Sequence, residues 1–320
     1  MPLGAVPRSR PDAAALRTGF VGLGLMGRPM AGHILAAGFP LTVHSRSPGP
    51  VEALVAAGAI DGGSPAGVAQ ASDVVVLMLP DPPDVAAVLF GTDGLVEGLQ
   101  RGAVVVDMST GDPRLAREWA GRLMNDGIGF LDAPVSGGEA GAIAASLSIM
   151  VGGEPDALEC ARPVLAAMGS RIVHIGPSGA GQITKAANQL VVAATIQAVA
   201  EALVLATKAG VNPVRVREAL LGGFAASRVL DLHGQRMIDG DFRPGGRVAL
   251  HLKDARIIQG LARALGSPVP AFDVVANALQ TLVERGGGDL DHAALVTLLE
   301  ADAEIGVASK TRRESEGGKR

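Results

Sequence analysis

The sequence has no tyrosine, one tryptophan, seven phenylalanines and one cysteine in 320 residues. The single cysteine, Cys160, cannot form a disulfide within the chain, so a reducing compartment is expected. Aromatic residues make up 2% of the chain and the formal net charge is −4. No nucleic-acid partner is therefore expected, because such a partner requires a basic surface and side chains that stack on bases.

Long apolar runs are also scarce. Residues 1–17 hold no apolar stretch of signal-peptide length, and no segment reaches the roughly 20 apolar residues of a membrane span. The nearest segment, Leu190–Leu205, is interrupted by polar residues such as Glu201. We therefore expect a soluble, cytoplasmic protein with no membrane partner, in which 1–17 and 308–320 are disordered tails.

From Thr18 to about Ile175, short apolar runs alternate with helix-like segments. The runs are TGFVGL, PLTVH, DVVVLML, AVVVDM, GFLDA, LSIMV and RIVHI. Runs without polar alternation are typical of strands that a parallel sheet buries on both faces. The alternation predicts an α/β, Rossmann-type doubly wound domain, here assigned to residues 18–180.

A different pattern follows. Gln182–Ala209 contains no glycine or proline and predicts one interdomain helix about 42 Å long. Further helical segments follow at 224–238, 249–265, 271–285 and 293–305, with no strand pattern. Residues 181–307 are therefore predicted to form an all-α substrate and oligomerisation domain. Because the long helix is apolar almost all round, we expect a homodimer or homotetramer.

The segment Gly22-Leu23-Gly24-Leu25-Met26-Gly27 fits the pattern G-x-G-x-x-G between a predicted strand and a predicted helix. Gly22 permits a tight turn, Gly24 lets the backbone approach a pyrophosphate, and Gly27 lets helix and strand pack closely. A pyrophosphate would bind at the helix N-terminus. We predict that these residues bind a dinucleotide; the alternative is an ordinary glycine-rich turn.

The end of the second predicted strand reads His44-Ser45-Arg46-Ser47 and contains no carboxylate. An NAD site usually has an acidic residue here, whereas Arg46 can bind a 2′-phosphate with help from the Ser45 and Ser47 hydroxyls. NADP(H) is therefore preferred as cofactor, with NAD(H) possible. The alternative is a surface arginine beside a turn.

Two further strand ends are expected to face the cofactor, because ligands of open α/β sheets bind beyond the carboxyl ends of the strands. They are Leu79-Pro80 and Ser109-Thr110. Either could also be a plain exit from strand to loop.

Four stretches together resemble the motifs of a known family. Residues Gly19–Gly27 resemble the cofactor signature of the β-hydroxyacid dehydrogenases, and Asp132–Gly138 resemble their substrate motif. Gly179–Asn188 resemble the catalytic motif, and Lys253-Asp254 the late lysine pair. The resemblance extends from Thr18 to Glu304.

The resemblance implies that Lys185 is the catalytic proton donor. Hydride delivery to an aldehyde leaves negative charge on oxygen, which a placed acid neutralises. A helix start and partial burial would lower the pKa of Lys185 toward neutrality, as a general acid requires. Asn188, three residues on, shares its face and could orient the lysine or bind substrate. A solvated lysine is the alternative.

The remaining site residues rest on the same resemblance. Ser136, Gly137 and Gly138 offer a hydroxyl and two backbone N–H groups to a substrate carboxylate, unless they form only a tight loop. Lys253 is expected to approach the cofactor and substrate, although a surface lysine is the alternative. His251 is expected to pack or to form a hydrogen bond. No residues have metal-ligand spacing, so no metal is expected.

The implied activity is reduction of a small carboxylate-bearing aldehyde or oxidation of the hydroxy acid. Residues 222–231 and 250–254 most resemble family members that convert 2-hydroxy-3-oxopropanoate to glycerate. Alternative substrates are 3-hydroxyisobutyrate, glyoxylate and succinic semialdehyde. A non-catalytic oligomerisation module and an imine-reducing branch are both disfavoured, because such relatives lack the lysine at position 185.

Overall fold

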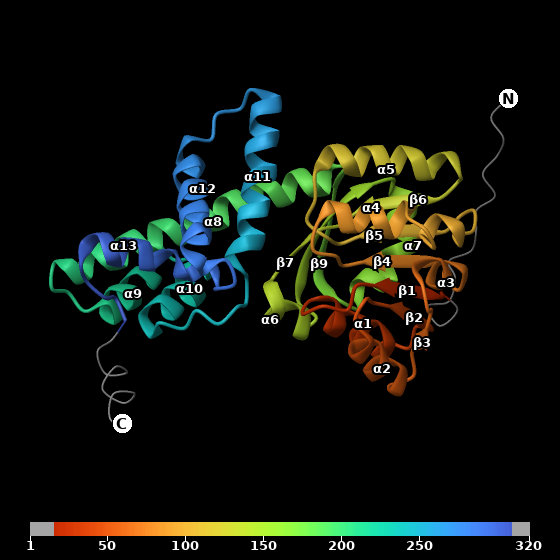
Figure 1. Ribbon diagram of the computed structural model, residues 1–320, viewed down its shortest axis with the longest axis horizontal. Coiled ribbons are helices and arrows are strands. Elements are labelled where there is room, and N and C mark those ends of the chain that lie inside the picture. Colours follow the sequence, from red (N-terminus) through yellow and green to blue (C-terminus); the bar gives the residue numbers. More distant parts are fainter. Residues whose placement is uncertain (1–15, 309–320) are drawn as a thin grey trace. The chain divides into compact units, whose positions relative to one another are not determined.

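The computed structural model describes residues 16–308 and divides into two compact units, up to Lys185 and from Ala186 onward (Figure 1). The predicted tails, 1–17 and 308–320, lie almost entirely outside the described residues. Arg17, at the end of the first predicted tail, is among the described residues, and its guanidinium pairs with Asp73 at 2.7 Å. The limits of the functional domains stay predictions.

The first unit is built on one sheet with the strand order β3-β2-β1-β4-β5-β6-β8-β7, and β9 pairs with β8. Strands β1 to β6 are parallel, whereas β8 is antiparallel to both β6 and β7. The predicted Rossmann-type fold is confirmed, with an antiparallel addition at one edge. The strands are β1 (Thr18–Val21), β2 (Leu41–His44), β3 (Ile60–Asp61), β4 (Val74–Leu77), β5 (Val104–Asp107), β6 (Gly129–Asp132), β7 (Val135–Ser136), β8 (Leu147–Gly153) and β9 (Gly169–Gly176).

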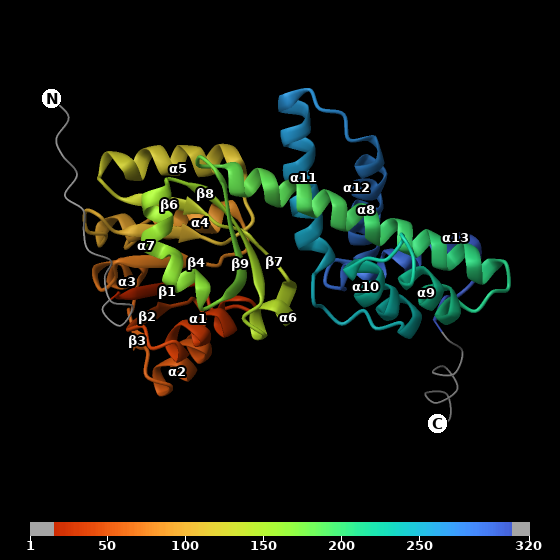
Figure 2. The ribbon, with the colours of Figure 1, turned by 180° about the vertical axis from the view of Figure 1, so that it is seen from behind.

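Helices cover both faces of this sheet (Figure 2). Side chains of α1, α2 and α7 join one hydrophobic cluster, and those of α3, α4 and α5 join another. Five of these helices have proline in their first turn, where its fixed φ suits the helix and its missing N–H costs nothing. The helices are α1 (Gly27–Ala36), α2 (Pro48–Ala56), α3 (Pro65–Gln70), α4 (Pro82–Phe90), α5 (Pro113–Asn125), α6 (Gly138–Ile143) and α7 (Pro155–Ala166), with a 3-10 turn η2 (Leu95–Glu97).

The second unit, over its described residues, is helical apart from one isolated bridge between Arg247 and Asp291. Its core gathers apolar side chains from α8, α10, α11, α12 and η4. The predicted all-α domain is confirmed. Its elements are α8 (Ala180–Lys208), α9 (Pro213–Leu221), α10 (Arg228–Asp239), α11 (Val248–Leu265), α12 (Pro270–Leu282), the π-helical turn η3 (Val283–Gly287), the 3-10 turn η4 (His292–Leu295) and α13 (Val296–Ala303).

Helix α8 begins in the first unit and continues through the second. By length and composition alone it could cross a membrane, since its most apolar 18-residue stretch has a mean hydropathy of 2.0. The prediction that no segment reaches this level is therefore wrong, because polar residues such as Gln197 and Glu201 lower the mean hydropathy of the helix too little. Ala193, Ile196 and Ala200 of α8 lie in the core of the second unit, and buried core helices meet the same criterion.

Candidate active site

The three glycines of the motif between β1 and α1 have different surroundings. Gly22 has φ +101°, and a Cβ there would meet the Met78 carbonyl oxygen at 2.3 Å. A Cβ at Gly27 would lie 1.9 Å from the Gly22 oxygen. At Gly24, by contrast, nothing lies within 4 Å of the Cβ position. The loop therefore has a tight turn, an open backbone and a close helix contact, which together suit a bound pyrophosphate.

The end of β2 lies beside this loop. Leu23 is buried and its backbone N–H donates to Ser45 Oγ at 3.4 Å, which ties the two segments together. Leu25, also predicted to bind cofactor, is exposed, and Met26 is half-buried just before α1. The neighbouring Arg46 and Ser47 are exposed.

The ends of β4 and β5 are joined by a hydrogen bond from the Leu79 N–H to Ser109 Oγ at 2.9 Å. Pro80 and Thr110 follow these two residues, so both predicted strand ends lie at the same edge as the glycine-rich loop. Gln182 fastens α8 to this edge, because its side chain accepts from the Gly111 N–H at 2.9 Å and donates to the Ser109 carbonyl at 2.8 Å.

Asp132, the last residue of β6, holds the start of α8. Its side chain has no solvent exposure and accepts from the backbone N–H groups of Gly179 at 2.7 Å and Gln182 at 2.9 Å. Burial raises the pKa of Asp132, while these backbone donors act in the opposite direction. A Cβ at Gly181 would lie 2.3 Å from the Asp132 carbonyl oxygen, so the helix can approach only without a side chain there.

Lys185 lies one turn into α8 and is buried, with 7% of its surface exposed. Its ammonium donates to the Val135 carbonyl at 2.7 Å. Val135 directly precedes Ser136, Gly137 and Gly138, so the structure brings the predicted proton donor and the predicted carboxylate site together. Gly137 and Gly138 have φ values of +139° and +60°, and both are exposed.

Lys253 and Asn188, the other two predicted site residues, lie in the second unit, where a series of polar contacts links them. The Lys253 ammonium is 3.2 Å from Asp254 Oδ1, and Gln189 donates to Asp254 Oδ2 at 2.7 Å. Asn188 donates in turn to Gln189 Oε1 at 3.0 Å. The carboxylate of Asp254 is buried and contacts Lys253 of α11 and Gln189 of α8, so it joins these two helices within the second unit.

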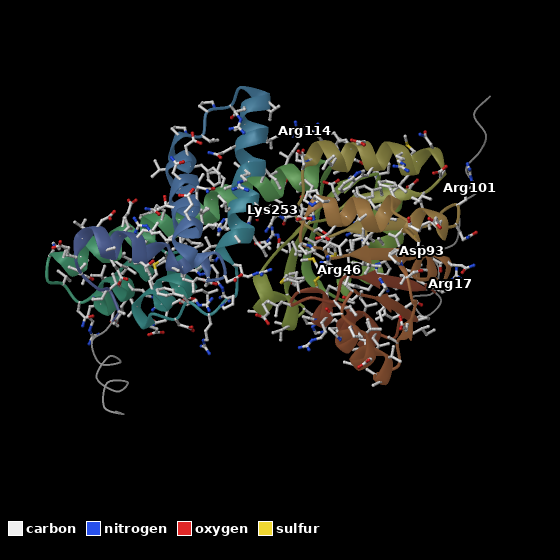
Figure 3. The ribbon with its side chains drawn as sticks, viewed as in Figure 1. Arg17, Arg46, Asp93, Arg101, Arg114 and Lys253 are labelled. Carbon is white, nitrogen blue, oxygen red and sulfur yellow. The ribbon has the colours of Figure 1, made fainter. Side chains whose placement is uncertain are left out.

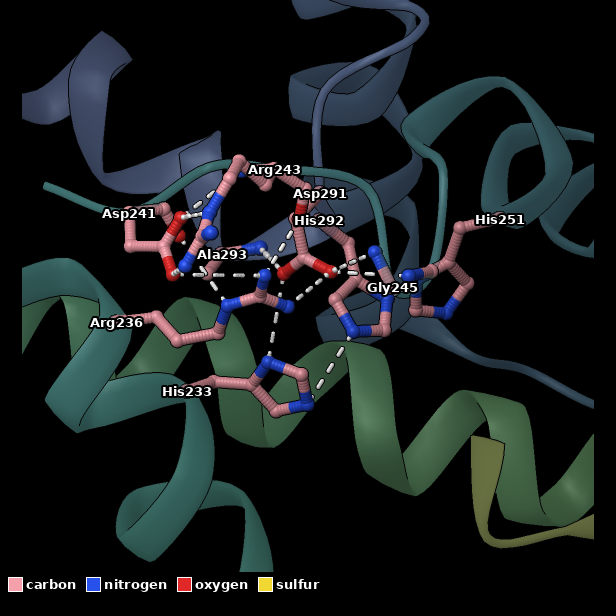
Figure 4. A network of polar contacts seen from close by, with 10 residues as sticks. His233, Arg236, Asp241, Arg243, Gly245, His251, Asp291, His292 and Ala293 are labelled. Carbon is pink, nitrogen blue, oxygen red and sulfur yellow. Dashed lines mark hydrogen bonds and ion pairs between the residues drawn. The ribbon is translucent and has the colours of Figure 1, made fainter. Parts of the chain in front are cut away.

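A second buried carboxylate lies deeper in the helical unit (Figure 4). Asp291 Oδ2 accepts from Arg236 Nη1 at 2.8 Å and from the N–H groups of Gly245 and Gly246 at 3.1 and 2.9 Å. Asp291 Oδ1 accepts from the Ala293 N–H at 3.0 Å. Asp291 thereby joins α10, the loop that precedes α11, and η4.

Three histidines continue this network. His233 Nδ1 is 3.5 Å from Asp291, His233 Nε2 is 3.3 Å from His292 Nε2, and His292 Nδ1 is 3.0 Å from His251 Nδ1. Burial, and then the neighbouring His251 and His233, lower the pKa of His292 to about 3. His251 thus forms a hydrogen bond, as expected.

Ligand atoms of His233, His292 and Asp291 lie within 4.8 Å of one another, a grouping that sequence spacing did not reveal. The Asp291 oxygens, however, already accept from Arg236 and three N–H groups. A cation would have to displace these donors and approach a guanidinium, so the network is better suited to structure than to metal binding.

Sequence reasoning assigned no role to Asp132, Gln182 or Asp254. All three lie within the stretches that resemble the family motifs, 132–138, 179–188 and 253–254, and this position was the only indication of a role. Their contacts depend on segments up to 73 residues away, which spacing cannot show.

Two family models match the chain. The NAD binding domain of 6-phosphogluconate dehydrogenase matches residues 17–176. The NAD-binding domain of NADP-dependent 3-hydroxyisobutyrate dehydrogenase matches residues 179–299.

Individual proteins are similar over nearly their full length. The 2-hydroxy-3-oxopropionate reductase of Escherichia coli (strain K12) is 44% identical over 286 residues, 89% of this chain and 97% of the relative. The NAD-dependent L-serine dehydrogenase of Pseudomonas aeruginosa is 34% identical over 288 residues, 88% and 97% respectively. The crystal structure of 3-hydroxyisobutyrate dehydrogenase from Salmonella typhimurium superposes with a TM-score of 0.81 at 30% identity, covering 88% of this chain and 99% of that one.

Proposed function

The chain belongs to the β-hydroxyacid dehydrogenase family, and from this premise we propose that it reduces 2-hydroxy-3-oxopropanoate to glycerate. It is an NAD(P)-dependent oxidoreductase. The choice of substrate is supported by the 44% identity with the bacterial 2-hydroxy-3-oxopropionate reductase. The mechanism rests on one observation, the buried Lys185 ammonium held 2.7 Å from the carbonyl that precedes Ser136.

The chain's own residues supply the proton and the orientation. When bound, the nicotinamide cofactor provides the hydride that forms the new C–H bond at the aldehyde carbon. Lys185 Nζ donates a proton to the carbonyl oxygen as its π bond breaks, and the lysine regains that proton from water. Asp132 and Gln182 fix the first turn of α8, so the ammonium is already oriented before substrate arrives.

The substrate carboxylate is proposed to bind the Ser136 hydroxyl and the N–H groups of Gly137 and Gly138. Both glycines are exposed and have no side chain that could shield their N–H groups, an arrangement that favours anions. Lys253 and Asn188 are proposed to contact the cofactor and the substrate respectively. The Asp254 carboxylate would hold both, through its ion pair with Lys253 and through Gln189.

NADP(H) is proposed as the preferred cofactor. The support is the exposed guanidinium of Arg46 at the end of β2, flanked by the hydroxyls of Ser45 and Ser47, with no carboxylate in this stretch. A guanidinium forms paired hydrogen bonds with a phosphate and has no comparable partner in a ribose 2′-hydroxyl. NAD(H) remains the second cofactor to test.

The test is an NADPH-oxidation assay with 2-hydroxy-3-oxopropanoate, glyoxylate and succinic semialdehyde, and NADP⁺ reduction with 3-hydroxyisobutyrate and L-serine. We expect the highest kcat/KM with 2-hydroxy-3-oxopropanoate; a far higher value for another compound would overturn the substrate assignment. Lys185→Met should lower kcat by about 10²- to 10⁴-fold while NADPH still binds. Lys208→Met, at the exposed end of the same helix, is the matched control and should retain full activity.

The chain is further proposed to act in the cytoplasm as a homodimer or homotetramer. Val191 and Leu205 of α8 are 61% and 73% exposed, which leaves apolar surface on this helix for a second copy. Light scattering of the purified chain tests the proposal, and a monomer at micromolar concentration would contradict it.

A further inference from the structure

The predicted 2′-phosphate ligand, Arg46, already has an anionic partner. Arg46 Nη1 lies 3.3 Å from Asp84 Oδ1, in the first turn of α4. The arginine side chain is 81% exposed and the aspartate side chain 29% exposed. Figure 3 labels Arg46 among the side chains of the first unit.

This ion pair bridges two neighbours of the central strand. In the sheet, β1 lies between β2 and β4. Arg46 follows β2, and Asp84 belongs to α4, which follows β4. The point between β1 and β4 is where the order of strands reverses, and a dinucleotide binds across the crevice at such a point. The hydrogen bond from Leu23 to Ser45 places the arginine's segment directly beside the glycine-rich loop.

We propose that Asp84 sets cofactor selectivity by competing with the 2′-phosphate of NADPH for Arg46. This inference rests on the proposed role of Arg46 in binding NADP(H). NADH has no 2′-phosphate, so the Arg46–Asp84 pair can persist when NADH binds. When NADPH binds, its 2′-phosphate either replaces the Asp84 carboxylate as the partner of Arg46 or binds the guanidinium together with that carboxylate.

Charge makes the competition unequal for the two cofactors. A 2′-phosphate carries between one and two negative charges at neutral pH, whereas a ribose hydroxyl carries none. The Asp84 carboxylate repels the 2′-phosphate and has no charge–charge interaction with the ribose hydroxyl. Because both side chains reach the surface, water and salt weaken the pair, and its effect should be moderate. Asp84 thus reduces a preference for NADPH that Arg46 creates, and it leaves NADH usable.

The experiment measures dissociation constants of NADPH and NADH for the full chain by nicotinamide fluorescence, without substrate. Asp84→Asn should tighten NADPH by about two- to fivefold at low salt and leave NADH nearly unchanged. Asp156→Asn is the matched control, since Asp156 is an exposed aspartate in the first turn of α7, and it should change neither constant. Raising the salt concentration should shrink the gain.

A second variant separates competition from simple repulsion. In an Arg46→Ala background, Asp84→Asn should improve NADPH binding by clearly less than it does in the natural chain. An equal gain in both backgrounds overturns the competition, as does an unchanged or weakened NADPH constant in Asp84→Asn alone. If Arg46→Ala weakens NADPH and NADH equally, the proposed NADP(H) preference itself fails. The substrate assignment is untouched by either result, because no substrate is present.

Discussion

Each unit of the chain is organised around one carboxylate with no solvent exposure, Asp132 in the sheet unit and Asp291 in the helical unit. Their partners differ in charge. Asp132 accepts from the backbone N–H groups of Gly179 and Gln182, whereas Asp291 also contacts the guanidinium of Arg236 and lies near two histidines.

The two carboxyl groups consequently have opposite pKa shifts. Burial raises the pKa of Asp132 more than its N–H donors lower it. Burial also opposes the ionisation of Asp291, but His233, His292 and the N–H groups of Ala293 and Gly246 outweigh it and hold the pKa of Asp291 far below the usual value. Two carboxyl groups without solvent exposure can therefore have opposite pKa shifts, because the groups that contact them differ.

The largest difference between the two units is expected when Asp291 loses its charge. Asp291→Asn should lower the free energy of unfolding of the helical unit by about 3–5 kcal/mol, because Arg236 would keep a charge without its buried counter-ion. Hydrogen exchange of peptides from α10 and α11 in the full chain measures this loss. Glu218→Gln is the control, since Glu218 pairs with Arg215 at the surface of the same unit and should cost less than about 1 kcal/mol. Equal effects would contradict the role given to Asp291.

Removing the charge of Asp132 should have a smaller effect on stability and a visible effect on catalysis. The amide of Asp132→Asn can accept only one of the two N–H bonds, which costs about 1–3 kcal/mol. The first turn of α8 then loosens, and kcat falls because Lys185 is less well positioned. Asp112→Ala removes the side-chain cap of α5 and should cost about 1 kcal/mol without lowering kcat. The same kcat for both variants would rule out the positioning role of Asp132.

The smallest effect is a difference between the units on mild acidification. A histidine whose folded pKa is depressed, as in His292, contributes stability above the unfolded value of 6.5 that is lost as pH falls toward 3. The pKa of Asp291 is also lowered, so its contribution to stability is likewise lost as the pH falls, but at lower pH than that of His292. Asp132 has a raised pKa, and it therefore stabilises the folded state most at low pH. Between pH 7 and 5.5 the helical unit should lose about 1 kcal/mol. The sheet unit should lose less, because burial lowers the pKa of its His44 while the charge of Asp61 acts in the opposite direction.

Hydrogen exchange at the two pH values, corrected for intrinsic rates, tests this difference, with peptides around β6 as the internal reference. His292→Gln should remove most of the pH dependence between 7 and 5.5. A loss confined to the sheet unit would contradict the assignment.

The sequence predicted the strands of the sheet well because buried apolar runs show clearly in the pattern. It did not predict that β8 runs antiparallel to β6, since the apolar pattern of a strand carries no direction. The strands β3 and β7 were not predicted, because two residues are too few to form a recognisable apolar run.

The site residues were predicted from short motifs, in which all residues are close together in the sequence. Such motifs indicate which residues form the site but not which distant residues contact them. The glycine-rich loop and Lys185 are of this kind. The partners that hold such residues are distant along the chain: Gln182 reaches Ser109, and Arg236 reaches Asp291, 55 residues on. Asp84 is 38 residues from Arg46 (84 − 46). Only folding brings these pairs together.

The continuity of helix α8 has a consequence for how this chain can vary. The units separate inside α8, between Lys185 and Ala186, so Lys185 and Asn188 are joined by unbroken helix, about 4.5 Å apart along its axis. A substitution in this stretch leaves that spacing intact. One inserted or deleted residue would turn everything downstream by about 100°, so the length of the segment is constrained more tightly than its composition.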